Sequence, residues 1–160
     1  MKLILDACCG SRMFWFDKKN PNAVFCDNRQ VLETLGDGRV LRIEPDILCN
    51  FKALPFPNKS FYLVVFDPPH LRRAGEKGWQ AKKYGVLPQD WQKELRQGFL
   101  ECFRVLKPNG TLVFKWSEVQ IPLSAVLNLA PEKPLFGDRR AGHGGQWVVF
   151  MKEARHEEEA

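Results

Sequence analysis

Short apolar runs recur along the chain, and most of them end at an aspartate or at a turn-forming residue. Runs of this length, bounded by Gly, Pro, Asn or Asp, predict buried β-strands. The clearest run is 61–66, which is apolar and β-branched and is expected at the centre of a sheet. Further strands are predicted over Leu3–Leu5, Ala23–Cys26, Val40–Ile43, Thr111–Trp116, Pro134–Phe136 and Gln146–Met151.

Helical patterns alternate with these runs. Between Gln89 and Leu106, apolar residues recur at spacings of three and four, which predicts an amphipathic helix. Shorter helices are expected within Ser11–Asn22, over Gln30–Leu35 and over Val119–Leu129. This alternation predicts a doubly wound α/β fold, with a mostly parallel sheet, helices on both faces and an antiparallel C-terminal strand. Because Asp6 arrives before a preceding helix can form, we expect a minimal fold truncated on its N-terminal side.

The length and composition of the chain indicate how many domains to expect and in which cellular compartment. A chain of 160 residues, 44% of them hydrophobic, can build one substantial core. We therefore expect one domain over 1–152, with a basic loop at 71–88, and a charged tail over 153–160. The apolar run before Asp6 is too short for a signal segment, and no stretch reaches the roughly 18 apolar residues of a membrane span. A cytoplasmic protein with no membrane partner is expected.

Charge and cysteine content narrow the ligand classes. Lys and Arg number 24 against 19 Asp and Glu, a net charge of +5, which is compatible with a polyanionic partner. The five cysteines include no CxxC pair, and no histidine stands at zinc-like spacing from them. No metal site is predicted.

Three aspartates stand at the ends of predicted strands. Asp6, Asp27 and Asp67 each follow an apolar run directly. In doubly wound sheets, ligands bind outside the carboxyl ends of the strands, so these three residues are expected to converge. The small residues from Ala7 to Gly10 suit the close approach of a ligand, or form a tight turn with no ligand. Asp27 is placed to accept hydrogen bonds from a ribose diol, or to cap the following helix.

Four blocks, taken in order, resemble a known family. The blocks are Leu5-Asp6-Ala7-Cys8-Cys9-Gly10, Asp27, Ala53-Leu54-Pro55-Phe56-Pro57 with Ser60-Phe61, and Arg104-Val105-Leu106-Lys107-Pro108-Asn109-Gly110-Thr111-Leu112. This order is similar to the class I, Rossmann-type S-adenosylmethionine-dependent methyltransferases and spans most of the chain. The resemblance implies a Rossmann-like methyltransferase fold, S-adenosylmethionine as cofactor and S-adenosylhomocysteine as product.

The resemblance also implies roles for particular residues. The turn at Gly10 would lie against the methionine part of the cofactor, Asp27 would hold the ribose, and Asn50 with Phe51 would lie beside the adenine. Two positions depart from the family pattern, because Arg12 stands where a second glycine is frequent and Asn50 where an acid is common. Arg12 could pair with the cofactor carboxylate or point to solvent. The implied cofactor-binding residues are Asp6, Ala7, Cys8, Gly10, Arg12, Asp27, Asn28, Asn50 and Phe51.

The stretch Asp67-Pro68-Pro69-His70 resembles the Asp-Pro-Pro-aromatic signature of the subfamily that methylates exocyclic amino groups, such as adenine N6 or cytosine N4. An exocyclic amine is a poor nucleophile because its lone pair is delocalised into the ring. The Asp67 carboxylate and the Pro68 carbonyl can accept its two N–H groups and orient the nitrogen. His70 stands where the subfamily usually has Tyr, Phe or Trp, and its ring can stack on a base taken from a single strand or rotated out of a duplex.

The segment 71–88 is basic and carries aromatic residues, as a surface that binds single-stranded nucleic acid does, although a solvated loop would have the same composition. The predicted substrate-binding residues are Pro69, Arg72, Arg73, Lys82, Lys83, Tyr84 and Lys115. A second basic run, Arg139-Arg140, could form another rim of the site.

The predicted function is therefore methylation of an exocyclic amine of a nucleobase in DNA or RNA, with adenine N6 favoured. Two alternatives stay open. The chain has no separate region of useful length for reading a nucleic-acid sequence, which leaves a methyltransferase acting on a small-molecule or protein amine. A non-catalytic nucleic-acid-binding protein could also use the fold as a scaffold. Without a recognition region, the protein could need a homodimer or another partner to hold its substrate.

Overall fold

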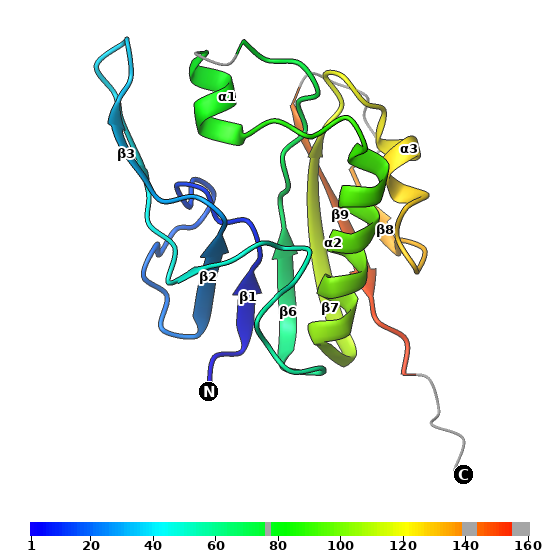
Figure 1. Ribbon diagram of the computed structural model, residues 1–160. Helices are drawn as coiled ribbons and strands as arrows, with labels where there is room; N and C mark the ends of the chain where they lie inside the picture. The colour runs from blue at the N-terminus through cyan, green and yellow to red at the C-terminus, as the bar shows by residue number, and fades with distance from the viewer. Residues whose placement is uncertain (76–77, 139–143, 155–160) are drawn as a thin grey trace.

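A seven-stranded sheet forms the centre of the computed structural model, which describes residues 1–75, 78–138 and 144–154 (Figure 1). The strands follow the order β5-β2-β1-β6-β7-β9-β8 across the sheet. Their bounds are β1 Ile4–Asp6, β2 Ala23–Asp27, β5 Ile47–Leu48, β6 Phe61–Phe66, β7 Leu106–Ser117, β8 Phe136–Gly137 and β9 Gly145–Met151. The first five strands of that order run parallel, while β9 pairs antiparallel with both β7 and β8. The predicted sheet, with its antiparallel C-terminal strand, is confirmed.

The predicted central strand has the expected surroundings. β6 lies between β1 and β7, and its residues Phe61, Val64, Val65 and Phe66 are buried. From β1 the chain moves outward through β2 to β5, and then returns to β6 on the other side of β1. The sheet therefore has a switch point between β1 and β6, where doubly wound folds bind ligands.

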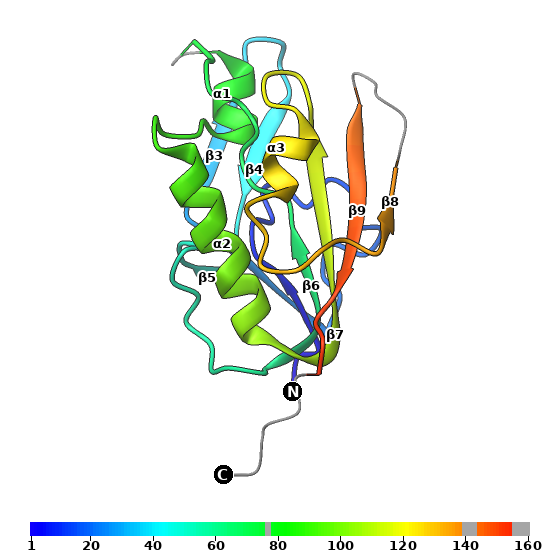
Figure 2. The same ribbon diagram turned by 90° about the vertical axis from the view of Figure 1, so that its right-hand side faces the viewer.

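One face of the sheet carries the main core and two helices. These are α2 (Trp91–Val105) and α3 (Leu123–Leu127), and both lie on the same side of the strands in Figure 2. Leu95 and Phe99 of α2 are fully buried, and the Phe99 ring lies 5.4 Å from that of Phe66 and 4.9 Å from that of Phe114. Burying each such side chain contributes about 1.5–3 kcal/mol. The amphipathic pattern over 89–106 thus predicted this helix and the face that it buries.

The opposite face has irregular cover instead of the expected helix within Ser11–Asn22. That segment forms a series of turns, and Arg12 in it has a left-handed φ of 55°. Trp15 packs its ring edge-on against Phe25 of β2, 4.8 Å away. Asn20-Pro21-Asn22 ends the segment soon after its aromatic residues, which leaves too short a stretch for a stable helix. The contact between Trp15 and Phe25 packs the segment against the sheet instead.

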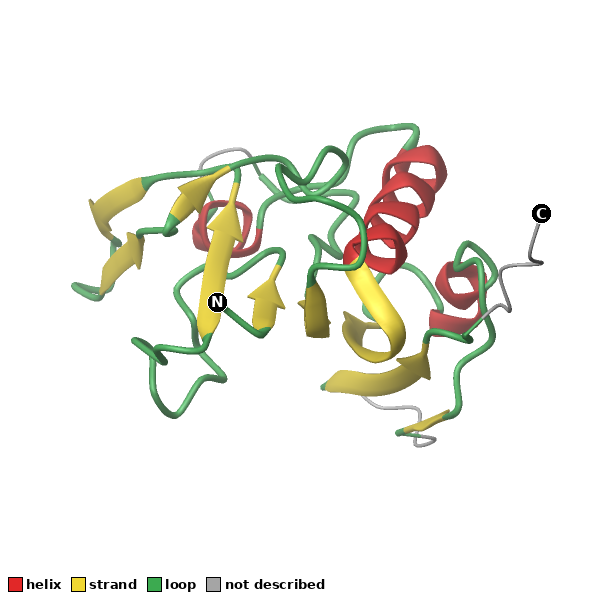
Figure 3. Cartoon of the chain, turned by 90° about the horizontal axis from the view of Figure 1, so that it is seen from below, coloured by secondary structure: helices red, strands yellow, loops and turns green. Residues whose placement is uncertain are grey.

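The helix predicted over Gln30–Leu35 is wrong. Residues Val31–Thr34 form strand β3, which pairs antiparallel with β4 (Val40–Ile43) in a separate two-stranded sheet. Gly38, at a φ of 83°, makes the turn between them, and Leu35, Leu41 and Ile43 bury a small core of their own. The apolar and β-branched residues therefore pair locally across this turn. Seen from below in Figure 3, this hairpin stands at one side of the main sheet.

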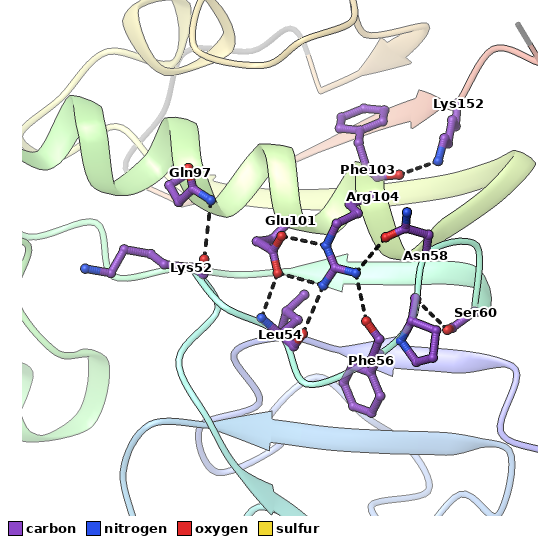
Figure 4. Close-up of polar contacts among 11 residues, drawn as sticks. Lys52, Leu54, Phe56, Asn58, Ser60, Gln97, Glu101, Phe103, Arg104 and Lys152 are labelled. Carbon is purple, nitrogen blue, oxygen red and sulfur yellow. Dashed lines mark hydrogen bonds and ion pairs between the residues drawn. The ribbon is translucent and has the colours of Figure 1, made fainter.

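Arg104 joins two of the blocks that resemble the methyltransferases (Figure 4). Its guanidinium pairs with Glu101 one turn earlier and donates to the carbonyls of Leu54 (2.9 Å) and Phe56 (2.8 Å). The Glu101 carboxylate in turn accepts the Leu54 N–H at 2.8 Å. The pairing with Arg104 lowers the Glu101 pKa. These contacts hold the segment before β6 against the end of α2.

The basic loop contains a short helix that the sequence pattern did not predict, α1 (Trp79–Tyr84), which lies beyond the carboxyl ends of the strands (Figure 1). Residues 76 and 77 of this loop, the run Arg139-Arg140 and the tail from residue 155 fall outside the described residues. No helix among the residues that the structure describes is long and apolar enough to cross a membrane.

Candidate active site

Two neighbouring pockets open where β1, β2 and β6 end, beside the switch point of the sheet. Their volumes are about 90 Å³ and about 50 Å³. The larger pocket is lined by several predicted site residues, namely Cys8, Gly10, Asp67, Pro68, His70, Lys83, Tyr84 and Lys115. The smaller one is lined by others, namely Ala7, Cys8, Asp27, Asn28, Phe51, Asp67, Pro69 and Tyr84. The fold therefore brings the Gly10 turn, Asp27 and Asp67 to one place, as expected.

Asp6 lies beneath the Gly10 turn and lines neither pocket. Its side chain is fully buried and accepts hydrogen bonds from the Cys8 N–H (3.2 Å) and the Trp15 Nε1–H (2.7 Å). Burial raises the Asp6 pKa to about 7, and the neighbouring carboxylates of Asp67 and Asp27 add to the rise. Asp6 thus supports the turn from below.

Asp27 holds the Gly10 turn from the side. One oxygen of its carboxylate, Oδ2, accepts the Gly10 N–H at 2.9 Å. The other, Oδ1, accepts the backbone N–H of Arg29 at 3.0 Å and its Nε–H at 3.2 Å. Gly10 has a φ of 49°, and no other residue comes within 4 Å of the place where a Cβ would stand. Glycine is therefore favoured by its backbone conformation, and the turn stays open toward the pocket.

Asp67 forms an ion pair with Lys115 of β7, with Oδ2 and Nζ 3.3 Å apart. Burial raises the Asp67 pKa, and the Lys115 ammonium opposes that rise. The Lys115 side chain runs beside Gly145, where a Cβ would stand only 2.9 Å from Lys115 Cε. Its ammonium also lies 5.4 Å from the Phe14 ring centre and 5.7 Å from that of Trp147. Lys115 is thus held beside Asp67 by its surroundings.

His70 stands among aromatic residues at the rim of the larger pocket. Its ring centre lies 5.3 Å from that of Tyr84 and 6.3 Å from that of Trp116. Burial lowers the His70 pKa, and the Lys115 ammonium adds to that effect. The imidazole is therefore neutral at neutral pH, which suits stacking on an uncharged ring.

No family model and no curated protein matches the sequence. Solved methyltransferases do match the structure. An S-adenosylmethionine-dependent methyltransferase from Methanosarcina mazei is 12% identical with a TM-score of 0.55, over 94% of this chain and 92% of that one. The N-methyltransferase NodS from Bradyrhizobium japonicum is also 12% identical, with a TM-score of 0.56 over 95% and 86% of the two chains.

A third structure is the 1,6-didemethyltoxoflavin-N1-methyltransferase from Burkholderia thailandensis, solved with 1,6-didemethyltoxoflavin and S-adenosylhomocysteine bound. It is 14% identical, with a TM-score of 0.55 over 94% of this chain and 71% of that one. The chain has the fold of these methyltransferases.

Besides Asp6, two predicted cofactor residues, Arg12 and Asn50, line neither of these two pockets. The Arg12 guanidinium donates to the Lys18 carbonyl (2.5 Å) and the Glu44 carbonyl (2.8 Å), pairs with Asp46 and lies 3.8 Å from the Phe25 ring centre. It thus joins the 11–22 segment to the chain after β4 and has only 16% of its side chain exposed, while its pairing with a cofactor carboxylate stays a prediction.

Asn50 is the second of these residues. Its side-chain oxygen accepts the Lys52 N–H at 2.9 Å, which closes a local turn. Its neighbours Cys49 and Phe51 line the smaller pocket instead. The contact between the Asn50 amide and the adenine stays a prediction.

The basic loop contributes to the site unevenly. Lys83 lines the larger pocket, whereas the Lys82 ammonium pairs with Glu33 of the hairpin. Arg72 and Arg73 are exposed and line neither pocket, and their backbone N–H groups donate to the Gln120 side chain at 2.6 and 2.9 Å.

Several residues of the site were not predicted from the sequence. Arg29 lines both pockets, Cys49 lines the smaller one, and Phe14 lines the larger one. Phe14 follows the glycine turn closely, and Arg29 follows Asp27 by two residues, so nearness to a predicted ligand residue was the available signal. Among the described residues, no group of three or more His, Cys, Asp or Glu could hold a metal ion.

Proposed function

We propose that the protein transfers a methyl group from S-adenosylmethionine to an exocyclic amine of a nucleobase in DNA or RNA, with adenine N6 favoured. One observation carries the proposal. Asp67 and Pro68, at the end of the central strand, line the same pocket as the Gly10 turn and His70. An acceptor for amine protons thus lies beside the turn that the methyltransferase resemblance gives to the methionine part of the cofactor.

The two pockets fit the parts of the cofactor. Asp27 offers its carboxylate to the ribose hydroxyls in the smaller pocket, where Phe51 gives an apolar ring for the adenine. The open turn at Gly10 allows the close approach of the methionine portion in the larger pocket. The cofactor's contribution is a methyl group on a positively charged sulfur, which makes that carbon electrophilic. The fold shared with the Burkholderia enzyme, which binds S-adenosylhomocysteine, supports this assignment.

The protein's own residues then orient the amine. The Asp67 carboxylate and the Pro68 carbonyl accept its two N–H groups, which points the nitrogen lone pair along the line of displacement. The N–C bond forms as the S–C bond breaks, and the nitrogen is left with one proton more than the neutral product has. Asp67, when ionised, is the acceptor within reach of that proton. His70 and Tyr84 offer rings against which the target base stacks.

Nucleoside mass spectrometry tests the proposal. DNA and RNA are incubated with the protein and S-adenosylmethionine labelled in its methyl group, and are then digested to nucleosides. We expect label in N6-methyladenosine or its deoxy form. Asp67→Asn keeps the shape but loses the carboxylate, so it should lower the yield about 100-fold or more. Asp37→Asn, which neutralises an exposed carboxylate of the hairpin turn, should leave the yield unchanged.

The outcomes separate the candidates. Undiminished nucleoside methylation by Asp67→Asn would contradict the role given to Asp67. Absence of S-adenosylhomocysteine binding in calorimetry would favour the non-catalytic scaffold.

Methylation of a small-molecule amine is the second candidate function. The observation that favours it is the small volume, about 90 Å³, of the pocket that contains both the Gly10 turn and Asp67, together with the absence of Arg72, Arg73 and Lys82 from its lining. The Burkholderia and Bradyrhizobium proteins share the fold, and the former was solved with a small molecule bound. Label that enters a nucleic-acid-free metabolite extract, and not DNA or RNA, would favour this function.

A further inference from the structure

Arg29 lies between the two pockets that the cofactor has to span. Four residues line both pockets, namely Cys8, Arg29, Asp67 and Tyr84, so these residues form the wall between them. Among them, Arg29 has the long side chain that bridges the two sides, with 27% of it exposed. The nucleoside and methionine portions of S-adenosylmethionine are joined covalently. A cofactor that fills both pockets therefore meets the Arg29 side chain.

Arg29 and the ribose of the cofactor compete for hydrogen-bond acceptor sites on the Asp27 carboxylate. A carboxylate offers about four lone-pair sites. Three N–H groups already use the Asp27 carboxylate, from the Gly10 backbone, the Arg29 backbone and Arg29 Nε. A ribose diol donates two hydroxyl hydrogens, and only one site is left. The two backbone donors are fixed by the Gly10 turn and by the turn after β2, so Arg29 Nε is the donor that can leave.

The same guanidinium also holds the substrate side of the site. Arg29 Nη1 donates to the carbonyls of Lys82 (3.0 Å) and Lys83 (3.5 Å) in the last turn of α1. The next residue, Tyr84, carries the ring that lies against His70. One side chain thus connects the proposed ribose acceptor with the proposed base-stacking pair.

Helix α1 has few other attachments among the residues that the structure describes. It is six residues long, buries none of them and has no side-chain cap at its N-terminus. The side chains of the Lys82–Glu33 ion pair are 35% and 41% exposed, and such surface pairs contribute little. The bonds from Arg29 are charge-assisted and half-buried, so they weigh more in fixing α1.

We propose that Arg29 is a positioning residue that couples cofactor binding to the substrate wall. Ribose hydroxyls displace Arg29 Nε from Asp27, the guanidinium leaves the space between the pockets, and α1 loses its tie to β2. The empty protein therefore has its substrate wall tied to Asp27 through Arg29, and the cofactor-bound protein has that wall released for the substrate. The inference rests on the proposed function, because it takes S-adenosylmethionine as the ligand of Asp27.

Calorimetry with S-adenosylhomocysteine tests the competition. Arg29→Ala removes the competing donor, and we expect it to bind S-adenosylhomocysteine roughly tenfold more tightly than the unaltered protein. Arg29→Lys keeps the charge but lacks the forked donor set, so its affinity should lie between the two. Arg39→Ala is the matched control. Arg39 also contacts α1, with its guanidinium 5.7 Å from the Trp79 ring centre, but it pairs with Asp37 and not with Asp27.

Hydrogen exchange tests the release of α1. The amides of Lys82 and Gly85 donate to the carbonyls of Gly78 and Ala81, so their exchange reports whether the helix is held. We expect saturating S-adenosylhomocysteine to speed their exchange in the unaltered protein and in Arg39→Ala. In Arg29→Ala, exchange should already be fast and should change little on binding.

A failure of the coupling can be distinguished from a failure of the proposed function. Binding of S-adenosylhomocysteine by all variants with equal affinity, or slower exchange at Lys82 and Gly85 on binding, overturns the coupling and leaves the proposed cofactor standing. If no variant binds S-adenosylhomocysteine, the proposed function and the coupling both fall.

Discussion

Replacing Lys115 with Met should shift the pH dependence of methyl transfer. The reaction proposed above needs the Asp67 carboxylate ionised, and the Lys115 ammonium, 3.3 Å away, favours that ionised form. Met retains the length and the apolar packing against Phe14 and Trp147 but has no charge. The substitution therefore removes the electrostatic effect while it preserves most of the shape.

The distance sets the size of the effect. Two unit charges at this separation interact by about 1 kcal/mol with the dielectric constant of water and about 5 kcal/mol with an effective value near 20. Both side chains are less than one-third exposed, so the pair lies between these limits. Because loss of Lys115 removes this interaction, which favours the ionised carboxylate, the Asp67 pKa should rise further.

The direction follows from the ionised form being the active one. Activity is present above the Asp67 pKa and is lost as the pH falls through it. Burial already raises this pKa, and Lys115 opposes the rise, so Lys115→Met should move the acid limb of the kcat profile to higher pH. Activity should recover on the alkaline side.

The assay is the initial rate of methyl transfer from labelled cofactor, measured across pH for the unaltered protein, Lys115→Met and Lys83→Met. Lys83 lines the same pocket, but its ammonium faces the Trp79 and Tyr84 rings, so it is the matched loss of charge. An acid limb that stays in place in Lys115→Met while the rate falls equally at every pH would refute the electrostatic role. Lys115 would then serve only to hold the substrate or the structure.

Three further changes test other parts of the molecule. Burial raises the Asp6 pKa in the folded protein to about 7, so the contribution of Asp6 to stability is present below about pH 4 and is lost as the pH rises toward 7. Asp6→Asn removes this titration, so its urea midpoints at pH 5 and pH 8 should differ less than those of the unaltered protein. Arg104→Met removes the bonds to Glu101, Leu54 and Phe56, and should lower the free energy of unfolding by about 2–4 kcal/mol at pH 7 in urea titrations. The Glu101 pKa is lowered by this pair, so the stability gained from it should disappear as the pH falls through that lowered pKa, and an unchanged acid profile in Arg104→Met would contradict the assignment. Gly145→Ala forces Lys115 Cε away from a Cβ at 2.9 Å, so methyl transfer should fall several-fold while the urea midpoint stays nearly constant; equal losses of both would mean that the backbone, and not Lys115, had shifted.

Much of the site was predictable because its residues lie at the ends of strands. The residue order shows directly that Asp27 and Asp67 end apolar runs. Because parallel strands bring their carboxyl ends to one edge of the sheet, these two residues could be expected to lie close together. The resemblance of the 104–112 block to the methyltransferases agrees with the observed fold, and Arg104 shows why that block and Leu54 lie together.

The β3–β4 hairpin could not be predicted from the local pattern of apolar residues. Over 30–35 the spacing of apolar residues is compatible with both a short helix and a strand, and the segment is too short to decide between them. The partner strand β4 lies beyond the turn at Gly38, and pairing with it decides the outcome. A prediction made from one segment at a time does not contain that pairing.

By itself, the sequence determined the order of the buried strands, the amphipathic helix over 91–105 and the aspartates at the strand ends, because each depends on residues adjacent along the chain. Only the tertiary structure decided which side chains meet. Phe66 pairs with Phe114 in the β6–β7 register, and that register places Asp67 beside Lys115 one residue further on. The path of the chain after β2 likewise places Arg29 against the last turn of α1. Such contacts depend on strand register and on loop path, and neither of these is encoded in the local alternation of polar and apolar residues.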